Sequence, residues 1–204
     1  MTKSIYELHD VVLPDGYMPS PGKHLANVRD CEHYLNSLDI LTELAPDTPA
    51  TVLDIGSWDG WLPLLLARDG YDVTAVEFIP ALVEAGRLYA RTFDIKNFVY
   101  MESDWLSSQP SKMSYDLVTA YEVLEHVTLD VLPEHINKME RYGRNISISL
   151  PDQDHHLNPQ HQWTPTQGLI EDFFGKKKNV SIRYKTYPGS TIPSNWFVTY
   201  GIGS

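Results

Sequence analysis

The stretch from Val52 to Trp61, V-L-D-I-G-S-W-D-G-W, combines two glycines and two acids at the point where a strand pattern gives way to a helix pattern. Gly56 and Gly60 fit a tight turn in which a ligand can approach the backbone closely. The turn is neither G-x-G-x-x-G nor a phosphate-gripping loop with a lysine, and Asp54 and Asp59 add negative charge there. These residues therefore favour a neutral or cationic ligand over one that is bound through its phosphates.

Side chains that can bind such a ligand also follow the next three strand patterns: Glu77 after residues 72–76, Asp104 after 98–101, and Tyr121 with Glu122 after 115–120. In an open α/β sheet, ligands bind at the carboxyl ends of the strands. A carboxylate after the second strand can accept hydrogen bonds from both ribose hydroxyls, and one after the third can accept from an adenine amino group. The arrangement predicts a nucleoside site.

Strand and helix patterns alternate along the chain and would position these side chains. Strands are expected at 51–55, 72–76, 98–101, 115–120, 146–150, 180–187 and 196–202, and helices at 30–44, 61–68, 80–91, from 122, and at 164–175. This alternation predicts a doubly wound, mostly parallel sheet with helices on both faces. No helix separates the last two strands, which predicts an antiparallel hairpin at the end of the chain.

Length and composition limit the possible kinds of protein. The 204 residues suit a single domain, with an N-terminal arm and helix over 1–48 and a cofactor-binding core over 49–204. A formal net charge of -11 makes nucleic acid an unlikely partner. The single cysteine, Cys31, fits a reducing compartment, and no segment reaches membrane-spanning length, so we predict a cytoplasmic protein. The sequence leaves the oligomeric state open.

Four motifs in order resemble those of the class I S-adenosylmethionine-dependent methyltransferases: V-L-D-I-G-S-W-D-G, V-T-A-V-E-F, M-E-S-D-W and Y-D-L-V-T-A-Y-E-V-L-E-H-V. The resemblance covers roughly residues 50 to 202. It implies a Rossmann-like methyltransferase fold with a seven-stranded sheet and a C-terminal hairpin. It also implies S-adenosylmethionine as the cofactor and methyl transfer to a small-molecule acceptor, at oxygen or nitrogen.

The resemblance assigns roles by position. Asp54, Gly56, Ser57 and Gly60 would shape the turn against the methionine part of the cofactor, and Tyr121 would face the same end. Glu77 would hold the ribose and Asp104 the adenine amino group, while Phe78 and Trp105 could flank the ring. Trp58 stands where G-x-G-x-G families have their middle glycine, which makes this turn bulkier.

The run Glu122-Val123-Leu124-Glu125-His126 is the second candidate for chemistry. In a helix, Glu122 would share a face with Glu125 and His126, and such a face can bind a divalent cation. E-x-x-E-H with a later histidine, His161, resembles the metal-binding small-RNA 2′-O-methyltransferases, and also the ubiquinone-pathway O-methyltransferases. The E-H-V ending is shared with many metal-free methyltransferases, so we predict that no metal is bound.

A metal-free enzyme that methylates a hydroxyl needs a base, and histidine has a suitable pKa. The candidates are His126, His155, His156 and His161. Two further alternatives remain open, a metal-assisted RNA 2′-O-methyltransferase and a module that binds S-adenosylmethionine without catalysis. A nicotinamide dehydrogenase is disfavoured by the missing G-x-G-x-x-G and by Asp59 in the turn.

Overall fold

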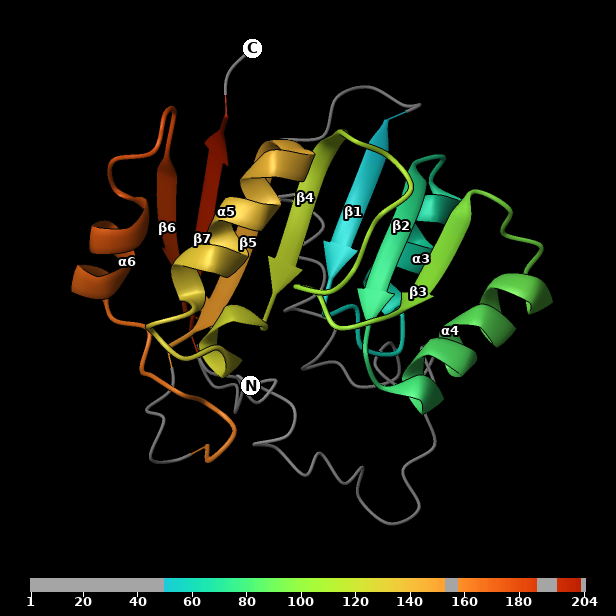
Figure 1. Ribbon diagram of the computed structural model, residues 1–204, viewed down its shortest axis with the longest axis horizontal. Coiled ribbons are helices and arrows are strands. Elements are labelled where there is room, and N and C mark those ends of the chain that lie inside the picture. Colours follow the sequence, from blue (N-terminus) through green and yellow to red (C-terminus); the bar gives the residue numbers. More distant parts are fainter. Residues whose placement is uncertain (1–49, 153–157, 187–193, 203–204) are drawn as a thin grey trace.

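A computed structural model describes residues 50–152, 158–186 and 194–202. Its centre is one seven-stranded sheet in the order β3-β2-β1-β4-β5-β7-β6 (Figure 1). The strands are β1 (Thr51–Ile55), β2 (Asp72–Glu77), β3 (Phe98–Glu102), β4 (Tyr115–Tyr121), β5 (Gly143–Pro151), β6 (Ser181–Lys185) and β7 (Asn195–Gly201). β1 to β5 pair in parallel, and β7 is antiparallel to both β5 and β6. The predicted fold class is confirmed, including the antiparallel hairpin.

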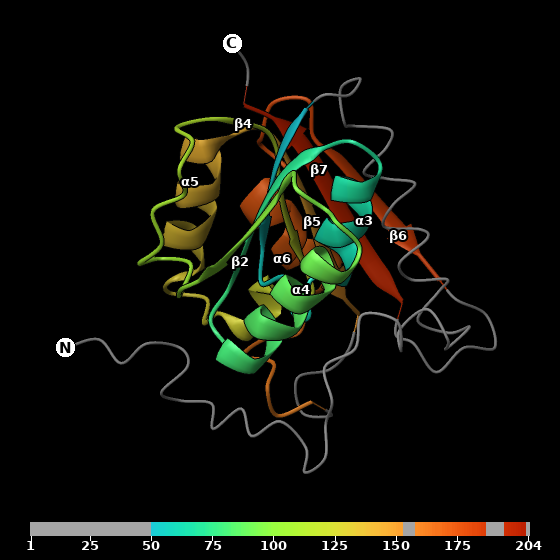
Figure 2. The ribbon, with the colours of Figure 1, turned by 90° about the vertical axis from the view of Figure 1, so that its right-hand side faces the viewer.

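Helices cover both faces of the sheet. Within the ranges given above they are α3 (Trp61–Arg68), α4 (Pro80–Thr92), α5 (Leu132–Tyr142) and α6 (Gln167–Phe174), together with the 3-10 turn η2 (Leu124–His126). Figure 2 shows α3 and α5 on opposite sides of the sheet. None of the helices in the described ranges is long and apolar enough to cross a membrane.

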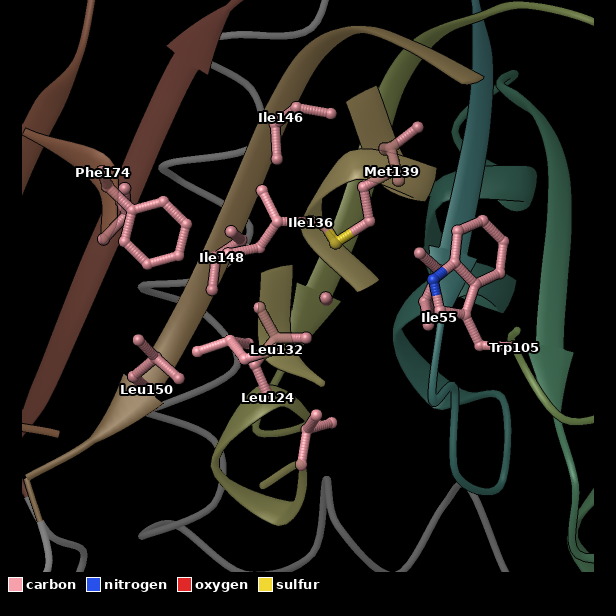
Figure 3. Packing of buried hydrophobic residues seen from close by; sticks show 14 of the residues in the cluster. Ile55, Trp105, Leu124, Leu132, Ile136, Met139, Ile146, Ile148, Leu150 and Phe174 are labelled. Carbon is pink, nitrogen blue, oxygen red and sulfur yellow. The ribbon is translucent and has the colours of Figure 1, made fainter. Parts of the chain in front are cut away.

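The larger core lies between the sheet and the face formed by α5 and α6. Ile146, Ile148 and Leu150 alternate along β5 and point to this side, as the period of a strand requires. They meet a helical stripe of Leu132, Ile136 and Met139 from α5 (Figure 3). This packing fixes β4 and β5, whose carboxyl ends carry the second group of candidate residues.

Some predicted elements differ from the structure. The helix expected from residue 122 is only the single turn η2, and Glu122 precedes it with a φ of 57°. α5 was not predicted, although its apolar residues recur at helical spacing and Pro133 occupies its first turn. α6 begins at Gln167 rather than near Thr164, because the Thr166 side chain caps it by accepting from the Leu169 amide. The predicted N-terminal arm and the helix at 30–44 lie outside the described residues.

The strand order places both groups of candidate residues at one edge of the sheet. After β3 the chain crosses back past β2 and β1 to form β4. β1 and β4 are therefore parallel neighbours, and the strand order reverses between them. Their carboxyl ends, with that of β2, point to the lower edge of Figure 1, where η2 also lies. This is the position at which doubly wound sheets bind ligands.

Candidate functional site

The turn after β1 has a backbone that only glycine adopts easily. Gly56 has a φ of 66° and Gly60 a φ of 81°. The Gly56 amide donates to the carbonyl of Val76 at 2.9 Å, which ties the turn to the end of β2. A Cβ at Gly56 would lie 2.4 Å from Cγ2 of Val123. The segment after β4 therefore approaches this turn too closely for any residue with a side chain at position 56. The turn is therefore packed between the ends of two strands.

Trp58 takes the place of the usual middle glycine and adopts a glycine-like conformation. Its φ is 51°, and a left-handed backbone costs a residue with a side chain roughly 1–2 kcal/mol. The Trp58 amide donates to Oε2 of Glu77 at 3.0 Å, and its carbonyl accepts from the hydroxyl of Tyr100. Bonds from two neighbouring strands thus hold this strained residue.

Glu77 is buried at the end of β2, 3% exposed. Its Oε1 accepts from the amides of Phe78 at 2.8 Å and Ile79 at 3.0 Å, at the start of α4. Burial raises the pKa of Glu77 to about 7, against the effect of these bonds. A carboxylate offers about four acceptor positions. Three are used here, so one ribose hydroxyl can take the remaining position, and a second must share or displace a backbone bond. The ribose-binding role of Glu77 stays a prediction.

Asp54 lies beneath the turn rather than at its surface. It is 3% exposed and accepts a hydrogen bond from the hydroxyl of Thr119 on β4, while Ser57 Oγ donates to the Asp54 carbonyl at 3.0 Å. Burial raises the pKa of Asp54 to about 6. These contacts suit a residue that shapes the turn from below.

Asp104 and Trp105 follow β3 but have different surroundings. Asp104 is partly exposed, and its Oδ1 accepts from the amide of Ser107 at 3.1 Å, so one oxygen of the carboxylate closes a turn, and the adenine-binding role of Asp104 stays a prediction. Trp105 is 2% exposed and packs in the larger core (Figure 3). Its ring cannot flank an adenine without leaving that packing, so we leave it out of the proposed site. Phe78 is partly buried beside Glu77.

Lys138 on α5 supports the turn that carries Asp104, a function that no sequence motif indicates. Its Nζ donates to the carbonyls of Trp105 at 2.5 Å, Leu106 at 3.0 Å and Ser108 at 2.6 Å. The same ammonium lies 4.4 Å from the centre of the Trp105 ring. A buried cation that satisfies several carbonyls fixes the backbone around it.

Tyr121 ends β4 on the side of the sheet that faces α3. Its hydroxyl is 2.7 Å from Oγ of Ser147, and its ring meets that of Phe197 edge to face at 6.2 Å. Burial raises its pKa well above the ordinary value. The hydroxyl therefore stays protonated, and contact with the methionine end of the cofactor remains a prediction.

The E-x-x-E-H residues do not share one helical face, and on this point the prediction was wrong. Glu122, outside η2, accepts from Ser149 Oγ at 3.1 Å and from the side-chain amide of Asn195. Burial raises the pKa of Glu122 to about 7. These two partners come from β5 and β7, and Glu122 is not part of the cluster that the other two residues form with His161.

Glu125, His126 and His161 do come together, each offering a ligand atom within 4.8 Å of the others. His126 Nε2 lies 3.7 Å from Oε1 of Glu125, and the two imidazole rings are 5.1 Å apart. His126 Nδ1 is 3.0 Å from the carbonyl of Gln160, and the amide of Gln162 donates to the carbonyl of Glu125 at 2.8 Å. These bonds fasten the segment with His161 to η2.

Glu125 is fully buried, and neither carboxylate oxygen has a hydrogen-bond partner among the described residues. Burial, and then the nearby charge of Glu122, raise its pKa well above the ordinary value. Two imidazoles and a carboxylate are a donor set that fits a divalent transition metal. Without a metal, one of the two imidazoles can instead act as a general base, next to the carboxyl group of Glu125. His155 and His156 lie outside the described residues.

Comparison with known proteins gives these residues a context. Residues 29–174 match a family described as a methyltransferase domain. The ubiquinone biosynthesis O-methyltransferases of Xylella fastidiosa and Xanthomonas campestris are 35% and 36% identical over 99 residues. Those alignments cover 47% of this chain but only 39% and 41% of the relatives, so the chain matches about two fifths of their length.

Solved structures share the fold at low identity. The magnesium protoporphyrin IX methyltransferase of Synechocystis, with bound S-adenosylhomocysteine, has a TM-score of 0.67 at 16% identity, over 86% of this chain and 85% of that one. A phosphoethanolamine N-methyltransferase of Haemonchus contortus with S-adenosylmethionine also has a TM-score of 0.67, at 14% identity, over 83% and 52%. The family match spans most of the chain, from before β1 to the end of α6, and includes the ends of β1 to β5. The chain belongs to the methyltransferase domain family.

Proposed function

We propose that this protein transfers the methyl group of S-adenosylmethionine to a hydroxyl oxygen of a small-molecule acceptor. The family match and the O-methyltransferase relatives support methyl transfer. The glycine turn supports this cofactor, because Asp54 and Asp59 would repel a pyrophosphate but tolerate a sulfonium and a nucleoside. On this proposal the cofactor lies across the ends of β1, β2 and β3, with the ribose at Glu77 and the adenine at Asp104.

The cluster of Glu125, His126 and His161 beyond β4 is the observation that supports oxygen, rather than nitrogen, as the atom that is methylated. A neutral amine attacks a methyl group with its own lone pair, whereas a hydroxyl must also lose a proton. An imidazole of the cluster would take that proton. The imidazolium that forms would favour the ionised form of the buried Glu125 carboxyl group beside it, and the resulting pair of opposite charges would stabilise the imidazolium. The acceptor oxygen bonds to the methyl carbon as the carbon–sulfur bond breaks, and S-adenosylhomocysteine leaves as a neutral thioether.

A divalent metal held by Glu125, His126 and His161 is the second candidate, favoured by the buried carboxyl oxygens of Glu125, which no hydrogen bond from the described residues satisfies. A bound cation would lower the pKa of an acceptor hydroxyl that coordinates it. The RNA alternative was motivated in part by the lysine run at 176–178. Lys177 in that run is bound to Glu140 at 2.6 Å, and the chain has a formal net charge of -11, so we keep a small molecule as the acceptor.

The test offers the purified chain labelled S-adenosylmethionine and a panel of phenols, catechols, alcohols and amines. We expect labelled methyl on oxygen, identified by mass spectrometry of the product. His126→Asn should lower turnover by a hundredfold or more, since general-base catalysis contributes about 10²–10⁴-fold. Binding of S-adenosylhomocysteine should stay unchanged in that variant. Methylation of amines alone, or full turnover by His126→Asn and His161→Asn, would rule out the proposed chemistry.

A further inference from the structure

Tyr100, on the edge strand β3, reaches the glycine turn across β2. It is 4% exposed, and its hydroxyl donates to the carbonyl of Trp58. Its ring fits between two glycines: a Cβ would lie 3.1 Å from the ring at Gly60 and 2.4 Å at Gly86 on α4. α4 therefore approaches this ring at a distance that a residue with a Cβ does not allow, and the turn leaves a Cβ little room.

The two peptide groups that flank Trp58 are held by different side chains. Glu77 accepts from its amide, and Tyr100 donates to its carbonyl. A tryptophan with a φ of 51° relaxes to another conformation unless its surroundings hold it. A glycine at this position would keep the turn open to a ligand unaided. With tryptophan at position 58, the side chains of Glu77 on β2 and Tyr100 on β3 must hold the turn in this conformation.

We propose that Tyr100 is a positioning residue for the cofactor, which holds Trp58 in a glycine-like conformation so that the turn can receive S-adenosylmethionine. The inference rests on the proposed placement of the cofactor at this turn. Tyr100 acts through the Trp58 backbone and needs no contact with the cofactor. It supplies by a side-chain bond what relatives with G-x-G-x-G obtain from a glycine.

The hydroxyl of Tyr100 is suited to act as a constant donor. Burial raises its pKa well above the ordinary value, and the nearby charges of Glu77, Asp54 and Asp59 raise it further. The phenol therefore stays protonated at neutral pH and can donate to Trp58 there.

The first test compares Tyr100→Phe with Tyr115→Phe. Tyr115 is also buried, and its hydroxyl donates to Thr74 Oγ1 at 3.1 Å, away from the turn. Calorimetric titration with S-adenosylhomocysteine should show a Kd about five- to tenfold higher for Tyr100→Phe, the effect of one lost hydrogen bond. Tyr115→Phe should lower the melting temperature of the free protein but leave Kd unchanged. Equal Kd values for wild type and Tyr100→Phe would overturn the proposal.

A second test asks whether the hydroxyl acts through Trp58. In a Trp58→Gly background the left-handed backbone costs nothing, so adding Tyr100→Phe should raise Kd by no more than about twofold. The same five- to tenfold loss in both backgrounds would overturn the proposal. In turnover assays, Tyr100→Phe should raise KM for S-adenosylmethionine and leave kcat nearly unchanged.

Gly60→Val separates a failure of this inference from a failure of the cofactor placement. If Gly60→Val weakens binding and Tyr100→Phe does not, the cofactor lies at the turn and the role of Tyr100 is refuted. If neither change affects Kd, the placement of the cofactor is wrong, and the inference is refuted with it.

Discussion

Replacing Glu77 with glutamine tests the centre of the proposed cofactor site. The amide oxygen of the new side chain can still accept from Phe78 and Ile79, but its NH₂ group would face the Trp58 amide, which now donates to Oε2 of Glu77 at 3.0 Å. Hydrogen bonds to a charged group contribute roughly 1.5–3 kcal/mol. Loss of one such bond to the ribose should raise the Kd of S-adenosylhomocysteine by about ten- to a hundredfold.

The pH dependence gives this prediction a second measure. The pKa of Glu77 is raised from 4.5 to about 7, and ribose hydroxyls bind its ionised form. Only about a tenth of the protein is ionised there at pH 6 and about nine tenths at pH 8, so wild-type affinity should rise about tenfold over this interval. Glu77→Gln should remove this rise, measured by calorimetric titration at several pH values.

The free protein should show the opposite trend in stability. Since the folded state holds the Glu77 proton more tightly than the unfolded chain, the free energy of unfolding should fall as pH rises from 4.5 to about 7. Asp54 and Glu122 contribute in the same direction, so the difference between wild type and Glu77→Gln isolates Glu77. Unchanged affinity and the same pH slope in the variant would refute the ribose-binding role.

Three further changes test other parts of the site. Asp104→Asn should raise the Kd of S-adenosylhomocysteine only a few-fold, because the amide oxygen can still accept; a loss equal to that of Glu77→Gln would contradict this division of roles. Lys138→Met leaves three carbonyls without their donor and should lower the free energy of unfolding by about 3 kcal/mol in urea titrations, whereas a stability within experimental error of wild type would contradict the proposed support of the Asp104 turn. Treatment with a chelator should leave turnover unchanged if the histidines act as bases; loss of turnover that a divalent cation restores, and that His161→Ala abolishes without changing cofactor affinity, would establish the metal instead.

The fold was predictable from the sequence because its motifs occur in order at strand ends. The V-L-D-I-G and V-T-A-V-E patterns fix β1 and β2, with Gly56 and Glu77 at their ends. α5 was missed although its apolar residues show a helical period, because Pro133 and the polar residues between them obscure it. Pattern and spacing act locally, and that is where the predictions were right.

The arrangement around η2 could not be predicted from the sequence, because it depends on residues that are distant along the chain. Glu122 binds Ser149 and Asn195, and no local pattern shows those partners. His161 reaches His126 across 35 positions for the same kind of reason. Likewise, Trp58 looked like a departure from a glycine pattern, and only the structure shows that its backbone still follows it.

The close contact among Gly60, Gly86 and Tyr100 has a consequence for how such sequences can change over evolution. A side chain at Gly86 would collide with the tyrosine ring at 2.4 Å, and one at Gly60 would meet it at 3.1 Å. A smaller residue at position 100 would relieve the collision at Gly86 but would also remove the hydroxyl that holds Trp58. Positions 86 and 100, together with residue 58, should therefore covary among relatives, with glycine at 58 wherever the tyrosine has been lost, whereas the φ of 81° favours glycine at position 60 whatever stands at position 100.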